Sequence, residues 1–273
     1  MKKLITLLAT VLLLLVPLAM SDSADITVTV GSAAPVVDSV FVGDANPTAG
    51  TTTQITITTQ ITDTNGVDDI TEVSAEFTSG SPDNGNDVTL MTRSICTDVD
   101  TDTIECNATY DMQFYDEYDT YAITVTAKDA AGNNDTNSDT FDYSELRALE
   151  LDVSAIAFGS MTVGQTKEVL GDETWGSGTA TIKNQGNSVI DAKINATDFT
   201  GSTDSFGAEE AEARFGALEY NDLTNEEEIE SGLNLAYGAS VLENVDFKLT
   251  IPLGALPETY TSQVRITAVA SLS

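Results

Sequence analysis

The stretch from Thr51 to Phe77 constrains the fold most, because it has the pattern of a strand, a turn and a second strand. Ile55, Ile57 and Ile61 fall on alternate positions among polar residues, which is the pattern of a strand with one buried face. Asn65-Gly66 in the turn supplies the positive φ that a tight reversal needs. Two half-apolar strands cannot bury themselves alone, so this stretch predicts packing against a second sheet.

The same alternation continues through residues 33–144, which we expect to form the first domain. Val88–Ile95 is predicted as a strand, and apolar residues alternate from Ile104 and again from Tyr121. Stretches rich in Gly, Asn and Asp separate these segments. About seven short strands at this spacing indicate an antiparallel β-sandwich.

A family resemblance rests on the run from Asp119 to Asn133, DTYAITVTAKDAAGN. It resembles the closing strands of bacterial and archaeal immunoglobulin-like cell-surface domains, which end in a tyrosine-containing strand and an Asp-x-x-Gly-Asn turn. The resemblance implies that the hydroxyl of Tyr121 makes a corner hydrogen bond. It implies a fold and says almost nothing about function.

Residues 149–273 resemble a second immunoglobulin-like class, found in envelope and matrix proteins. The resemblance rests on Phe158–Gly164 and Gly178–Asn187, which fit the pattern FGxxxxG followed by N-x-G-N. It fails between Gly201 and Gly238. There Ala208, Ala211 and Phe215 have helical spacing, which predicts a short helix near 207–215. The alternative is an acidic surface loop. The functional interpretation is a contact element for a partner.

Together these observations predict an all-β fold of two tandem immunoglobulin-like antiparallel β-sandwich domains, the second with a short helical or irregular insert. The first domain is expected at 33–144 and the second at 149–273. The joint between them contains no Gly-, Ser- or Pro-rich linker.

Residues 1–21 have the pattern of a secretory signal peptide, with Lys2 and Lys3 before an apolar run and small residues before a cut after Ser21. An uncleaved anchor is the alternative. The signal predicts a secreted protein, extracellular or at the cell surface, with no membrane-spanning segment after cleavage. In the N-terminal segment 22–32, Ile26, Val28 and Val30 alternate with polar residues. This pattern predicts a strand that pairs either with its own domain or, as a donated strand, with a neighbour.

The chain is strongly acidic, with 11 Lys and Arg against 44 Asp and Glu and a net charge of −33. Such a field repels nucleic acid and anionic lipid, so we expect no nucleic-acid partner. There is no His, which removes the commonest general base and all imidazole metal ligands. No phosphate-binding loop, dinucleotide fingerprint or nucleophile elbow is present, and we therefore expect no enzyme.

Calcium is the one cofactor that the acidic residues suggest, because it takes clustered hard oxygen ligands from loops. The first candidate site is the turn that contains Asp63, Asn65, Asp68 and Asp69. A weaker candidate is the run that contains Asp98, Asp100, Asp102 and Glu105. The alternative for both is a solvated turn of an acidic protein.

Cys96 and Cys106 are the only cysteines, and an exported chain with an even count predicts a disulfide between them. Asn107, Asn134 and Asn195 begin N-x-Thr triplets, which fit surface glycosylation.

These features predict a secreted, non-catalytic structural or adhesive protein of a microbial cell envelope or extracellular matrix. One alternative is a self-assembling filament or pilus subunit that uses donated strands. Another is a carbohydrate-binding module, although Trp175 stands alone in a Gly-rich turn. An enzyme of unfamiliar type is a third. The expected partners are other envelope or matrix proteins or further copies of the chain, with glycans as another class.

Overall fold

The computed structural model describes residues 25–79 and 90–271. The predicted signal peptide lies outside these residues. The described chain is all-β, with antiparallel pairing between its named strands and three short 3-10 helices. No helix among the described residues is long and apolar enough to cross a membrane.

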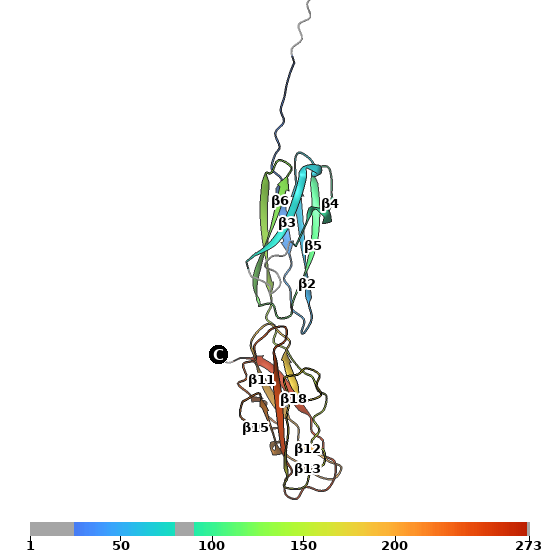
Figure 1. Cartoon of the computed structure of the whole chain (residues 1–273), viewed down its shortest axis with the longest axis vertical. Helices are drawn as coiled ribbons and strands as arrows, with labels where there is room; N and C mark the ends of the chain where they lie inside the picture. Colours follow the sequence, from blue (N-terminus) through green and yellow to red (C-terminus); the bar gives the residue numbers. More distant parts are fainter. Residues whose placement is uncertain (1–24, 80–89, 272–273) are drawn as a thin grey trace, which may run out of the picture. The chain divides into compact units, whose positions relative to one another are not determined.

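Two sheets form the first sandwich (Figure 1). One has the order β1-β2-β5-β4 and the other β3-β6-β7. The strands are β1 (Val36–Val42), β2 (Thr53–Thr62), β3 (Ile70–Ser79), β4 (Cys96–Asp98), β5 (Thr103–Met112), β6 (Asp119–Asp129) and β7 (Asn134–Tyr143). The 3-10 helices η1 (Val67–Asp69) and η2 (Arg93–Ile95) precede β3 and β4.

The core of this sandwich follows the predicted alternation. Ile55, Ile57 and Ile61 on β2 are buried, as are Tyr121 and Ile123 on β6, where the opposite sheet faces them. Gly66 adopts the positive φ (103°) that the Asn-Gly turn predicted. The strand expected at Val88–Ile95 is wrong in its described part: Leu90–Thr92 are irregular, and η2 then leads into the short β4.

Covalent and side-chain contacts tie the two edge strands of the first sheet, β1 and β4, to neighbouring strands. Cys96 on β4 lies opposite Cys106 on β5, and a disulfide joins them, as the sequence predicted. On β1, the amides of Val37 and Val42 donate to carboxylates of β7, those of Asp135 and Asp139, at 2.9 Å each. Side chains therefore occupy hydrogen-bonding groups of β1 that an incoming strand would need.

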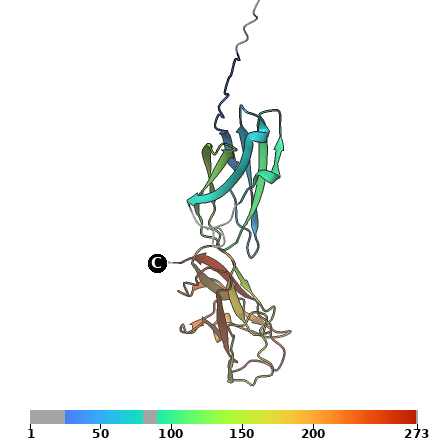
Figure 2. The same cartoon turned by 45° about the horizontal axis from the view of Figure 1, so that its top comes forward.

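The second sandwich holds a larger and a smaller sheet (Figures 1 and 2). The larger has the order β15-β14-β17-β10-β8, with β9 also on β17, and the smaller β16-β11-β18. A separate hairpin joins β12 and β13. The strands are β8 (Leu149–Leu151), β9 (Thr166–Val169), β10 (Thr181–Asn184), β11 (Ile190–Ala196), β12 (Phe199–Thr200), β13 (Ser205–Phe206), β14 (Ala211–Phe215), β15 (Asn221–Asp222), β16 (Ile229–Glu230), β17 (Leu242–Thr250) and β18 (Val264–Ala270).

The helix expected near 207–215 is limited to a single 3-10 turn, η3 (Ala208–Glu210). The residues after it form β14, which pairs with β17. Ala211, Ala213 and Phe215 are buried on alternate positions of this strand. The spacing of Ala211 and Phe215 fits one face of a helix as well as one face of a strand, and the pairing with β17 decides for the strand.

The buried hydrophobic residues form two clusters, one in each sandwich. The second is less completely covered, because many of its apolar side chains are only partly buried. Those on β8 and the irregular chain after it include Leu151, Val153, Ile156, Phe158 and Met161. The division of the chain into domains at residues 33–144 and 149–273 stays a prediction.

Candidate functional site

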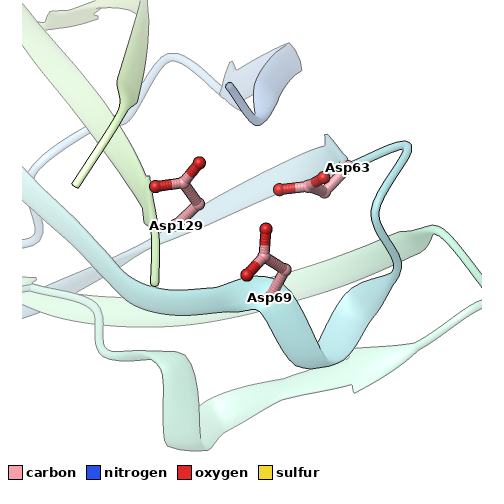
Figure 3. Close-up of side chains that lie close together, drawn as sticks. All are labelled: Asp63, Asp69 and Asp129. Carbon is pink, nitrogen blue, oxygen red and sulfur yellow. The ribbon is translucent and has the colours of Figure 1, made fainter. Parts of the chain in front are cut away.

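Three carboxylates converge at one end of the first sandwich. One oxygen from each of Asp63, Asp69 and Asp129 lies within 4.8 Å of those of the other two. Figure 3 shows the three side chains pointing toward a common space. Asp63 and Asp129 are 1% and 2% exposed, and Asp69 is partly buried.

Both sheets contribute to this acidic trio. Asp63 follows the last residue of β2, in one sheet. Asp69 ends η1, directly before β3, and Asp129 is the last residue of β6, both belonging to the other sheet. The trio therefore spans the two layers at the sandwich end.

The hydrogen bonds of the trio leave one buried oxygen unsatisfied. Asp63 Oδ1 accepts from the amide of Asn65 at 2.8 Å. Asp129 accepts from Asn133 through both carboxylate oxygens, from the amide and from Nδ2, at 2.7 Å each. Asp63 Oδ2 is buried and has no hydrogen-bond partner in the part of the chain that the structure describes. A buried carboxylate oxygen without a donor or cation is costly.

Only two of the four residues predicted for the first calcium site lie in the trio. Asn65 instead accepts a hydrogen bond from the amide of Ala33 on its Oδ1 at 2.6 Å, and Asp68 is exposed on η1. Asp129 was missed. The sequence feature that marks Asp129 is the Asp-x-x-Gly-Asn turn, which begins at this residue.

The second predicted acidic run does not converge. Asp98 pairs with Arg93 at 3.3 Å, and Asp100 Oδ1 accepts the amides of Asp102 and Thr103. Hydrogen bonds from Asp102 lower the pKa of Asp100, whereas the hydrogen bond and charge of Asp100 raise the pKa of Asp102. Glu105 accepts from Nδ2 of Asn107. Among the described residues, the trio is the sole group of three acids close enough to share one ion.

The other predicted surface positions differ in accessibility. Asn107 on β5 and Asn134 on β7 are exposed, whereas Asn195 on β11 is partly buried. Glycosylation at all three stays a prediction.

A second candidate site involves the N-terminal segment and a groove in the second sandwich. Asp25–Val30 forms no strand and pairs with no other strand in the described chain. Its alternating apolar side chains are open to solvent: Ile26 is 95% exposed, and Val28 and Val30 are each 81% exposed. The chain divides into two compact units, and the second begins after this segment, at Ala33.

The groove lies within the second sandwich and has a volume of about 1500 Å³. Its lining is largely apolar and comes from the chain after β8, the β12–β13 hairpin, β17 and the chain that leads into β18. Representative lining residues are Val153, Phe158, Phe206, Leu249 and Val264. β18 is the last strand of its sheet and pairs only with β11 among the named strands.

Comparisons with known proteins add little to this geometry. No family model and no curated protein matches the chain. A chaperone–tip adhesin complex of CFA/I fimbriae biogenesis is 10% identical, with a TM-score of 0.34, over 88% of this chain and 84% of that one. The CsuC–CsuE chaperone–tip subunit complex of Acinetobacter baumannii Csu pili is 8% identical, with a TM-score of 0.36, over 84% and 99%. A carbohydrate-binding module of the β-sandwich superfamily is 12% identical, with a TM-score of 0.29, over 89% and 100%. These values are too low to support an argument about function.

Proposed function

We propose that the protein is a non-catalytic structural subunit of a microbial cell envelope or extracellular matrix, and that its copies assemble by strand donation. Asp25–Val30 of one copy would occupy the groove in the second sandwich of the next. One observation carries the proposal: Ile26, Val28 and Val30 are alternating apolar side chains, all more than four-fifths exposed, on a segment that pairs with no strand among the described residues.

The alternation gives the segment the chemistry of a donated strand. In an extended backbone, Ile26, Val28 and Val30 project from one face, and Thr27 and Thr29 from the other. Main-chain hydrogen bonds to an open sheet edge supply affinity, and alternate side chains fill pockets and supply register. A segment of this length is marginal alone, which fits its lack of strand structure in a single copy.

The second sandwich offers the better acceptor. Its core contains partly buried apolar side chains, including Val264 and Ile266 of the edge strand β18. Val264 also lines the groove, so a strand laid along the start of β18 would turn its apolar face toward that groove. By contrast, Asp135 and Asp139 cover the edge of β1 in the first sandwich.

Donation between copies also predicts the form of the assembly. The donor segment and the acceptor groove are different surfaces of one chain, so each copy can both give and receive a strand. Head-to-tail contacts of this kind form open chains unless their rotation closes a ring. The expected product is therefore a filament or a large ring that grows with protein concentration.

Electron microscopy and size-exclusion chromatography of the mature chain over a concentration series test this function. The test variant replaces Ile26, Val28 and Val30 with Ser, and the matched control replaces Thr27 and Thr29 with Ser. We expect assemblies from the wild-type chain and the control, and monomers from the test variant. Monodisperse wild-type protein at every concentration, or equal assembly of both variants, would reject strand donation.

Glycan binding receives no comparable support from the described residues. The exposed aromatic side chains there are Phe41 on β1, Tyr118 before β6 and Trp175 between β9 and β10. They lie on separate elements and form no continuous row against which a sugar could stack. We therefore do not propose a carbohydrate-binding function.

A further inference from the structure

We propose that Asp63, Asp69 and Asp129 form a calcium site that fastens the two sheets of the first sandwich together. This inference goes beyond assembly and does not depend on it. Its basis is the convergence of the three carboxylates, together with the buried Oδ2 of Asp63, which has no hydrogen-bond partner and belongs to this group.

The spacing of the oxygens fits one calcium ion. Calcium binds oxygen at 2.3–2.6 Å, so two ligands on opposite sides of the ion are about 4.6–5.2 Å apart. The trio's oxygens lie within 4.8 Å of one another, inside that limit. Magnesium binds at 2.0–2.1 Å and demands stricter octahedral geometry. Carboxylates from loop and strand ends suit the more adaptable calcium shell.

The charges around the trio also favour a cation. Two of its carboxylates are almost fully buried, where repulsion between like charges is less screened than at the surface. The adjacent basic side chains have other partners. Arg93 donates to the carbonyl oxygens of Val67 and Ile70 and pairs with Asp98. Lys128, next to Asp129 in the chain, pairs with Glu72.

An ion at this place would have a structural effect. It would join Asp63, at the end of β2, to Asp69 and Asp129, at the ends of the opposite sheet that meet there. The turn between Asp63 and Asp69 also contacts the chain at Ala33, whose amide donates a hydrogen bond to Asn65 Oδ1. Calcium would therefore order the point from which the N-terminal segment leaves the sandwich.

Isothermal titration and thermal melting with calcium chloride test the site, on mature protein first stripped with a chelator and dialysed. We expect one ion per chain, with a Kd in the roughly 10⁻⁴–10⁻³ M range of extracellular modules. Binding to the folded state alone raises the melting temperature. Sodium chloride at equal ionic strength should raise it less, and magnesium chloride should do so more weakly than calcium.

Single substitutions locate the ion. Asp63→Asn and Asp69→Asn should each weaken calcium binding at least tenfold. Removing one of three like charges also relieves repulsion, so the metal-free melting temperature should not fall with Asp69→Asn, the least buried of the three. Asp111→Asn is the matched control, because Asp111 is exposed on β5 and an amide still accepts from Gln54. It should bind calcium as the wild type does.

Three results would overturn the proposal. One is an equal melting shift in calcium chloride and in sodium chloride of the same ionic strength, which would leave only screening. Another is equal binding of magnesium, which would remove the calcium assignment. The third is wild-type calcium affinity in a folded Asp69→Asn variant. None of these results bears on assembly, which is measured separately with substitutions in residues 26–30.

Discussion

The hydroxyl of Tyr121 donates a 2.6 Å hydrogen bond to the carbonyl oxygen of Glu117, four residues earlier in the chain. Tyr121 is 1% exposed, and its ring stacks on that of Phe141 at 5.4 Å between centroids. This bond confirms the corner contact expected from the sequence around β6. In the second sandwich the hydroxyl of Tyr260 lies 3.0 Å from the carbonyl oxygen of Leu256, also four residues earlier, and 2.8 Å from Oδ2 of Asp204, a competing acceptor.

Tyr121→Phe tests the contribution of this bond. The substitution keeps the stacked ring but removes the donor of a part-buried hydrogen bond to the Glu117 carbonyl oxygen. We expect a loss of about 1–2 kcal/mol in the free energy of unfolding. Urea denaturation followed by near-ultraviolet circular dichroism measures it. Tyr118→Phe is the control, since Tyr118 is 48% exposed, and it should change stability by less than about 0.5 kcal/mol. Equal effects of both would show that the corner bond contributes nothing.

Alkaline pH should destabilise the first sandwich through Tyr143, which is buried, and Tyr110, which is partly buried. Burial, with a further contribution from the charge of Asp116, raises the pKa of Tyr110 and of Tyr143 to about 12 from 10.0. A pKa higher in the folded state than in the unfolded state means that stability is complete below pH 10 and is lost as the pH rises toward 12. Urea midpoints measured between pH 8 and pH 12 should fall above pH 10. Constant midpoints across this range would contradict the prediction.

Acid should weaken the second sandwich through Asp191 on β11. Burial raises the pKa of Asp191, but hydrogen bonds from Ser231 Oγ and from the amides of Leu233, Ala192 and Gly232 lower it overall. Its stabilising effect is present above the unfolded pKa of 3.8 and is lost as the pH falls through the lower folded value.

Asp191→Asn measures that effect. We expect the variant's free energy of unfolding to fall by on the order of 2 kcal/mol at pH 7. The reason is that the four hydrogen bonds to Asp191 would then meet a neutral amide instead of a charged carboxylate. Its stability should also depend less on pH between 5 and 2. The fluorescence of Trp175, the single tryptophan, reports unfolding of this sandwich. A variant with the same acid dependence as the wild type would show that other carboxylates govern acid unfolding.

The strands of the first sandwich were readable from the sequence because its buried residues alternate strictly, as on β2 and β6. β14 was harder to predict from the sequence, because Ala211 and Phe215 also fit helical spacing and only the pairing with β17 selects the strand. The prediction of a strand at Val88–Ile95 was wrong over its described part, because Leu90 and Met91 are adjacent and the apolar residues there do not alternate strictly.

The acidic trio was only half predictable. Asp63 and Asp69 lie in one short turn, so their proximity follows from the chain itself. Asp129 lies far along the sequence and reaches them only because β6 pairs with β3 and brings their ends together. The exposure of Ile26, Val28 and Val30 likewise could not be read from their alternation, which fits a strand paired within its own chain equally well.

Peptide complementation is the most direct test of strand donation. A chain that starts at Gly31 is mixed with a peptide of residues 22–31, and the melting temperature of the second sandwich is followed by Trp175 fluorescence. Strand donation predicts saturable one-to-one binding and a higher melting temperature. A peptide with Thr27 and Thr29 changed to Ser should bind and raise the melting temperature as the native peptide does, and one with Ile26, Val28 and Val30 changed to Ser should do neither. No shift with the native peptide, or equal shifts with all three peptides, would rule out strand donation.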